Sequence, residues 1–259
     1  MDWQEIFGNW VLVPPRPVGV VHFLGGAFIA AAPHITYRRL LEYLADRGFV
    51  VVATPFINTF DHTVIAEEVL WSFNKALDLL ERRSRIEPRL PIYGVGHSMG
   101  CKLHLLVGSL FESVERSGNV LISFNNFAAR ESIPMFSQFS QLAPTPAIPT
   151  EFKPSPQETK RLVAQHYQVQ RNLLIKFSND SLDQSLPLAD LLENSFPGSI
   201  ATQRLRGNHL TPLGQNLNTR TMGLGGFAPI NMIGDFVQQE VFRELGQLED
   251  VMGCWLAGV

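Results

Sequence analysis

The sequence comprises 259 residues, of which 45% are hydrophobic and 17% charged, and its formal net charge is −3. This proportion of apolar residues can offset the entropy of ordering the chain, which excludes intrinsic disorder. With 21 Lys and Arg against 24 Asp and Glu, the chain lacks the basic excess that predicts binding to nucleic acid or anionic lipid.

The cysteine content and the apolar stretches indicate a cytoplasmic protein. Cys101 and Cys254 are too few for a disulfide framework and suit a reducing compartment. The first ten residues lack the basic flank of a signal peptide. The most apolar stretch, residues 18–32, contains His22 and two glycines and is shorter than the about 20 residues that span a bilayer. We therefore expect no integral membrane segment, and no spacing of metal-ligand residues suggests a metal or cofactor.

Apolar strands alternate with amphipathic helices along most of the chain. Expected strands cover residues 18–24, 49–54, 90–95, 119–124, 171–177 and 199–205, and expected helices cover residues 34–48, 63–83, 99–111, 188–195 and 235–255. Parallel strands need crossover connections, so the alternation predicts an α/β protein with a mostly parallel central sheet and helices on both faces. In such sheets the chemistry lies at the carboxyl ends of the strands.

Residues 127–168 interrupt this regularity with several prolines and short amphipathic pieces. Their aromatic side chains suit a lid that closes over a substrate, but they equally suit simple packing of the insertion onto the core. We predict a core domain formed by residues 1–126 and 169–259 and a lid or cap formed by residues 127–168. A lid of this kind would imply a substrate with an apolar portion.

The strongest motif is the pentapeptide Gly96-His97-Ser98-Met99-Gly100, which lies between an expected strand and an expected helix. This is the Gly-x-Ser-x-Gly pattern in the strand–turn–helix context that a nucleophile elbow requires. A structural turn serine is the alternative, but the context favours Ser98 as a nucleophile.

A serine nucleophile needs a base, and the base needs an acid to orient it. Among seven histidines, His209 directly follows the last expected strand and therefore lies at the correct edge of the sheet. Asp180 follows the preceding strand and is the favoured acid, with Asp183 as the alternative because it could equally cap a helix. Asn125 and Asn126 end the strand before that, which is the alternative position for an acid, but amides supply no charge.

The tetrahedral oxyanion needs backbone donors. One is expected to be the N–H of Met99, and the other is expected from the turn at residues 24–27, with Gly26 favoured over Ala27. Asp61 and His62 look like a second catalytic pair, but their place before a helix favours Asp61 as an N-terminal cap.

The turn Leu24-Gly25-Gly26, the elbow, Asp180 and His209 occur in the order of the α/β-hydrolase superfamily, which the chain resembles over nearly its whole length. Residues 22–28, 53–56, 59–62 and 180–184 are similar to a family of hydrolase-like proteins of cyanobacteria and plastids, catalogued as a domain of unknown function. The resemblance implies an α/β-hydrolase fold with a lid insertion after the strand at residues 119–124. It implies a reaction class without a substrate, and the His-Phe-Leu-Gly-Gly turn departs from the usual His-Gly.

These observations predict a serine hydrolase of carboxylic esters or thioesters whose substrate is a small or lipid-like molecule with an apolar acyl or alcohol portion. The residues expected to contact the substrate are Phe28, His97, Phe127, Phe136 and Phe139. Two alternatives stay open: a non-catalytic binding or scaffold protein that retains the fold, and a different chemistry such as perhydrolysis or C–C bond hydrolysis.

Overall fold

The computed structural model describes residues 1–27, 29–83, 85–112, 114–128, 151–214 and 235–258, which contain one eight-stranded sheet of order β1-β2-β4-β3-β5-β6-β7-β8. The strands from β3 to β8 run parallel to their neighbours, whereas β1 and β2 are antiparallel. The strands are β1 (Gln4–Ile6), β2 (Asn9–Leu12), β3 (Gly19–Leu24), β4 (Phe49–Ala53), β5 (Ile92–His97), β6 (Gly118–Ile122), β7 (Asn172–Phe177) and β8 (Ile200–Leu205). The predicted, mostly parallel α/β sheet is confirmed.

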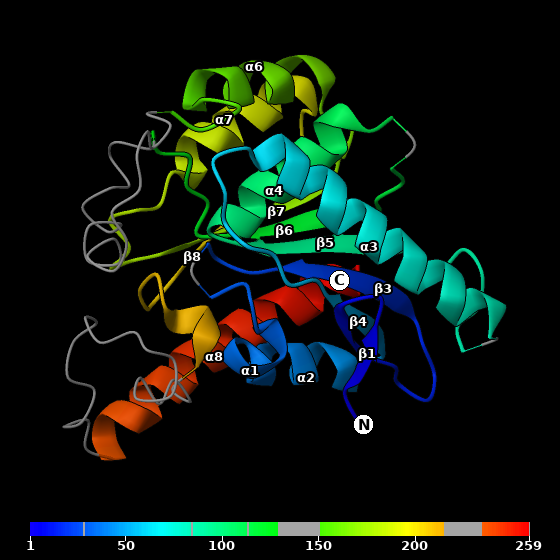
Figure 1. Cartoon of the computed structure of the whole chain (residues 1–259). Coiled ribbons are helices and arrows are strands. Elements are labelled where there is room, and N and C mark those ends of the chain that lie inside the picture. The colour runs from blue at the N-terminus through cyan, green and yellow to red at the C-terminus, as the bar shows by residue number, and fades with distance from the viewer. Residues whose placement is uncertain (28, 84, 113, 129–150, 215–234, 259) are drawn as a thin grey trace, which may run out of the picture.

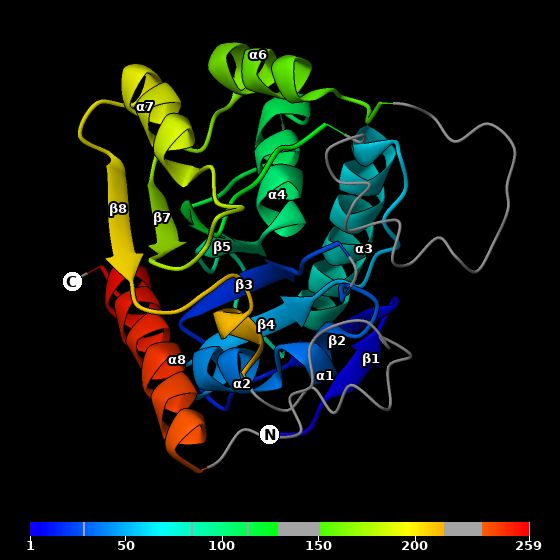
Figure 2. The ribbon, with the colours of Figure 1, turned by 90° about the vertical axis from the view of Figure 1, so that its left-hand side faces the viewer.

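Helices cover both faces of the sheet (Figure 1). One face carries α1 (Pro33–Thr36), α2 (Arg38–Asp46) and α8 (Asp235–Leu256), and the other carries α3 (His62–Arg82), α4 (Met99–Leu110), α6 (Pro156–His166) and α7 (Ser185–Ser195). Figure 2 shows the short helix η2 (Thr211–Leu213), which closely follows β8, against α2 and α8. None of the described helices is both long and apolar enough to cross a bilayer.

The central strands are apolar because both of their faces are covered. Every residue of β3, β4 and β6 is buried. Leu40, Leu44 and Leu248 pack beneath one face of the sheet, and Leu103 and Leu106 of α4 pack on the other. The two-sided core holds the loops at the carboxyl ends of β5, β7 and β8 in fixed positions.

Three local expectations differ from the structure. The edge hairpin of β1 and β2 is absent from the prediction, since strands of three and four residues show too little periodicity. The single helix expected over residues 34–48 is divided at Tyr37, whose backbone is not helical and whose side chain is completely buried. Helix α7 begins three residues earlier than expected, at Ser185.

The part of the expected insertion that the structure describes packs onto the core. Phe152 is buried, with its ring centroid 5.6 Å from that of Phe60 and 4.5 Å from that of His62. Helix α6 lies against α4, and Val163 and Tyr167 belong to a buried cluster. Residues 151–168 thus follow the packing alternative, while residues 129–150 lie outside the described residues and the lid stays a prediction.

Candidate active site

Ser98 lies at the sharp turn between β5 and α4, at the carboxyl edge of the sheet. Its backbone has φ +55° and ψ −117°, a strained conformation for a residue with a side chain. A Cβ at Gly96 would lie 2.6 Å from the Cys101 nitrogen, and one at Gly100 would collide with the Leu24 carbonyl oxygen. Close backbone contacts therefore require both glycines of the motif. Gly100 allows the turn after β3 to pack directly against the elbow.

His209 reaches the serine from the loop after β8. Its Nε2 lies 3.1 Å from the Ser98 Oγ, and its Nδ1 lies 2.8 Å from the Asp180 Oδ2. A carboxylate only accepts hydrogen bonds, so Nδ1 carries the proton and Nε2 offers its lone pair to the serine hydroxyl. This is the tautomer that a general base requires.

The structure separates the two candidate acids. Asp180 follows β7, is 6% exposed and accepts hydrogen bonds from His209 through Oδ2 and from the Leu182 N–H through Oδ1. Asp183 instead pairs with Lys176 at 3.3 Å and accepts hydrogen bonds from the backbone and hydroxyl of Ser185, the first residue of α7. Of the two carboxylates, Asp180 is the one that contacts His209. Asp183 binds the first residue of α7 but precedes the N-cap residue, Gln184, so it is not the helix cap that was its alternative.

The environment of Asp180 favours its charged form. Burial acts to raise the pKa of this carboxyl, but the hydrogen bond and charge of His209, together with hydrogen bonds from Ser123 and Leu182, outweigh it and lower the pKa from its usual value. Asp180 is therefore ionised near neutral pH and can stabilise an imidazolium on His209.

The two expected oxyanion donors differ in their surroundings. Met99 is the first residue of α4, where a backbone N–H has no acceptor within the helix. The Gly26 N–H already donates to the Tyr37 hydroxyl at 2.8 Å, so the first choice for the second donor is engaged elsewhere. Ala27, the alternative donor, is next in the turn and becomes the better candidate.

His97 has a different environment from the substrate contact that we expected. It is 1% exposed, and its Nε2 donates to the carbonyl oxygen of His209 at 2.9 Å, because a carbonyl cannot donate. Its Nδ1 therefore accepts, at 2.8 Å, from the Tyr37 hydroxyl. The chain of hydrogen bonds from Gly26 through Tyr37 and His97 fixes the backbone of the base, so His97 positions His209.

Asn125 is the site residue whose contact the sequence did not predict. Its Nδ2 donates to the Ser98 Oγ at 3.0 Å. The hydroxyl oxygen thus accepts from Asn125 while it faces His209, which holds the serine in one rotamer. The sequence offered one signal, an amide at the end of the strand before the acid, but a donor to the nucleophile could be recognised only once β5 and β6 were known to be neighbours.

Three further expectations concern the aromatic substrate contacts, the Asp61–His62 pair and metal binding. Phe127 is described and half-buried, whereas Phe28, Phe136 and Phe139 lie outside the described residues. Asp61 caps α3 through hydrogen bonds from Thr63 and Val64, as predicted. Within the ranges that the structure describes, no group of three or more His, Cys, Asp or Glu side chains is placed to hold a metal ion.

Solved structures share the architecture of this chain. A carboxyl esterase 2 from the mycorrhizal fungus Tuber melanosporum has a TM-score of 0.61 at 16% identity, covering 97% of this chain and 84% of its own. A fluorophosphonate-binding serine hydrolase F of Staphylococcus aureus gives 0.55 at 14% identity, over 78% and 85% of the two chains. A thioesterase domain from the curacin biosynthetic pathway gives 0.51 at 14% identity, over 86% and 97%. These likenesses show the α/β-hydrolase fold.

Sequence comparison gives a family but no characterised relative. No curated protein matches the chain. The family model described as "Protein of unknown function (DUF1350)" matches residues 2–258. Because the match spans nearly every residue, the chain belongs to the DUF1350 family.

Proposed function

We propose that the protein is a serine hydrolase that cleaves carboxylic esters or thioesters. The observation that carries the proposal is the continuous contact from the Ser98 Oγ through His209 to Asp180, at 3.1 and 2.8 Å. The esterase, serine hydrolase and thioesterase domain of the same fold support the reaction class.

Acylation begins when the Ser98 Oγ attacks the carbonyl carbon of the substrate and His209 Nε2 takes the hydroxyl proton. The carbonyl oxygen becomes an oxyanion, which accepts hydrogen bonds from the N–H groups of Met99 and Ala27. The protonated His209 then gives its proton to the leaving alcohol or thiol, and the acyl group stays on Ser98. Asp180 stabilises the imidazolium throughout.

Deacylation repeats these steps with water as the nucleophile. His209 takes a proton from water, the hydroxide attacks the acyl carbon, and the collapsing intermediate releases a carboxylic acid. The proton on His209 returns to the Ser98 Oγ, which restores the starting state. The Asn125 amide, already bound to this oxygen, stabilises the negative charge that it carries as it leaves the acyl group.

A fluorophosphonate probe, which phosphonylates activated serines, tests the proposal. We expect the probe to label the wild type and to leave the Ser98→Ala and His209→Ala variants unlabelled. Ser109→Ala is the matched control, because this buried serine lies at the other end of α4 and its hydroxyl donates to the Leu105 carbonyl oxygen. Labelling that persists in Ser98→Ala would contradict the proposal by placing the reactive serine elsewhere. No labelling of the wild type would contradict it and favour the binding or scaffold alternative.

The substrate class is tested separately. We propose an apolar acyl or alcohol portion from the aromatic side chains of the insertion, of which Phe136 and Phe139 lie outside the described residues. Short and long p-nitrophenyl esters and the matching acyl thioesters, compared by kcat/KM, separate esterase from thioesterase activity and measure the preference for chain length. Product analysis distinguishes hydrolysis from perhydrolysis and C–C cleavage.

A further inference from the structure

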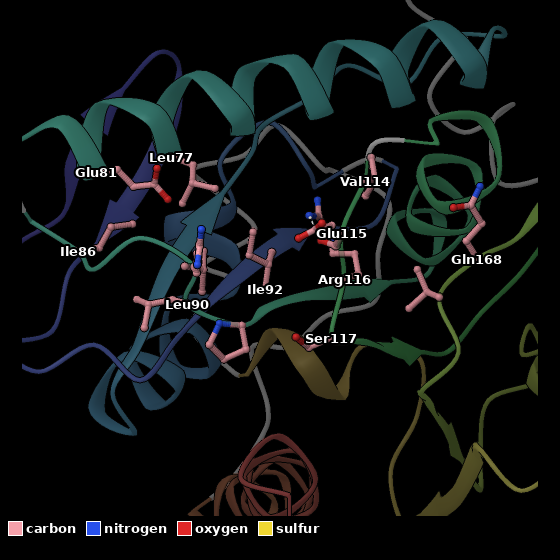
Figure 3. A pocket seen from close by; sticks show the side chains of 14 residues that line it. Leu77, Glu81, Ile86, Leu90, Ile92, Val114, Glu115, Arg116, Ser117 and Gln168 are labelled. Carbon is pink, nitrogen blue, oxygen red and sulfur yellow. Dashed lines mark hydrogen bonds between the residues drawn. The ribbon is translucent and has the colours of Figure 1, made fainter.

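A pocket of about 680 Å³ lies at the edge of the sheet opposite Ser98 (Figure 3). Val20 comes from the start of β3, Ile92 begins β5, and Ser117 directly precedes β6. These strands are parallel, and Ser98 follows the other end of β5. The pocket is therefore separate from the candidate active site.

The walls of this pocket combine apolar and polar side chains. Helix α3, the loop after it and the loops before β6 and β7 supply the side chains of Leu77, Ile86, Leu90, Val114 and Val169 (Figure 3). The volume of the pocket is within the range of small-molecule sites. Two arginines line the pocket, Arg89 and Arg116, and the guanidinium of Arg116 is the one that reaches the buried Phe73 and His22.

The guanidinium of Arg116 is held in place without an acidic partner. It lies 4.9 Å from the centroid of the Phe73 ring, and Nη1 donates to the Glu115 carbonyl oxygen at 3.1 Å. Its Nε is buried and has no acceptor among the described residues, and within these residues no carboxylate forms an ion pair with it. Burial lowers the pKa of this group to about 10, so it stays charged near neutral pH.

The neighbouring imidazole of His22 does not neutralise this charge. The Thr54 hydroxyl donates to the Asn9 Oδ1 at 2.6 Å, so its oxygen must accept from His22 Nε2 at 3.1 Å. The other nitrogen, Nδ1, is then unprotonated, and its lone pair faces the Arg116 Nη2 at an N–N distance of 3.5 Å. His22 is neutral, and its pKa is lowered by burial and by His104 and Arg116.

A partly buried charge with no ionic partner is costly unless an anion compensates it. We propose that this pocket binds a carboxylate with a single negative charge and an apolar tail, the carboxylate pairing with Arg116 and the tail contacting the apolar walls. The other charged residues that line the pocket, Glu81, Glu115 and Arg89, together carry a net negative charge, which disfavours a second negative charge on the ligand. A small dianion such as phosphate fits this arrangement less well, since it has no part that the apolar walls would bury.

Isothermal titration calorimetry with octanoate tests the proposal, with 1-octanol and inorganic phosphate as comparison ligands. We expect saturable binding of octanoate to the wild type, with 1-octanol and phosphate binding at least about tenfold more weakly, because a hydrogen-bonded charge pair contributes about 1.5–3 kcal/mol. Arg116→Met should lose the same factor. Arg47→Met is the control of equal charge change, because Arg47 caps α2 on the other face of the sheet and stacks on Tyr43.

A second variant protects the test against a folding defect in Arg116→Met. Leu90→Trp enlarges a wall residue that is partly exposed in the loop before β5, and it should abolish octanoate binding while the melting temperature stays close to that of the wild type. Equal binding of octanol or phosphate would overturn the proposal. Full binding by Arg116→Met would also overturn it, since the carboxylate would then bind elsewhere, such as at Ser98.

Discussion

Replacing Asp180 by Asn exchanges one carboxylate oxygen for an NH2 group and tests the tautomer of His209 directly. Asp180 uses its two oxygens for two donors, the His209 Nδ1–H and the Leu182 N–H. An Asn side chain has only one acceptor oxygen, so it must turn its amide toward one of these two groups. If the amide faces His209, the imidazole takes the other tautomer and presents Nε2–H to Ser98, which removes the base.

The other orientation of the Asn side chain also costs free energy. The amide would then face the Leu182 N–H, donor against donor, and leave that N–H unsatisfied at a cost of about 1–3 kcal/mol. We therefore expect the inactive tautomer to prevail and kcat/KM to fall by about 10⁴-fold, which corresponds to about 5 kcal/mol of transition-state stabilisation.

The assay is the second-order rate constant of fluorophosphonate labelling, which needs no knowledge of the substrate. Asp183→Asn is the matched control: it removes a carboxylate three residues away that contacts Lys176 and Ser185 but not His209. This control should react within a few-fold of the wild type. Labelling of Asp180→Asn at a rate near that of the wild type, or a larger loss in Asp183→Asn, would refute the assignment of the acid.

Three further predictions concern stability. Gly100→Ala should lower the free energy of unfolding, measured in urea, by about 1–3 kcal/mol, because the new Cβ would collide with backbone atoms. Gly246→Ala is the control: its Cβ meets open space, so this change should raise the free energy of unfolding by up to about 1 kcal/mol. Equal effects of the two changes would contradict this reasoning. Tyr37→Phe should cost about 1–3 kcal/mol, because the hydroxyl that donates to His97 is lost, and an unchanged urea midpoint would deny the network any role in stability. Burial lowers the pKa of the Lys102 ammonium in the folded protein to about 7, from an ordinary value of 10.5. Between these two pH values the unfolded chain keeps a proton on Lys102 that the folded protein has lost, so the contribution of Lys102 to the stability of the wild type rises with pH. The advantage of Lys102→Met in melting temperature should therefore shrink as the pH rises from 7 toward 10, and a constant difference would contradict the shift.

The local patterns of the sequence were sufficient for most of the fold and for the proposed triad. Alternating strands and helices predicted the sheet, because buried parallel strands must be apolar on both faces. The spacing of Gly96, Ser98 and Gly100 predicted the elbow, because close backbone contacts admit only glycine at both ends. His209 and Asp180 followed from chain order, since each comes directly after a strand of the same sheet.

The rest of the site depends on which segments lie side by side in space, and chain order does not give this. Asn125 became a partner of Ser98 through the pairing of β5 with β6. Tyr37 falls inside the helix expected over residues 34–48, where helical periodicity says nothing about its hydroxyl. In the structure this hydroxyl accepts from the N–H of Gly26 and so changes the choice of oxyanion donor. Arg116, in an irregular loop, gave no periodic signal at all.

The hydrogen bonds of His97 also decide how many protons the site can exchange. Two imidazoles, those of His97 and His209, lie with their ring centroids 5.0 Å apart. Burial and the nearby His209 lower the pKa of His97 to about 3, and its one proton is committed to the carbonyl of its neighbour. His97 therefore stays neutral near neutral pH and exchanges no proton with the site, so proton transfer to and from Ser98 involves the imidazole of His209 alone.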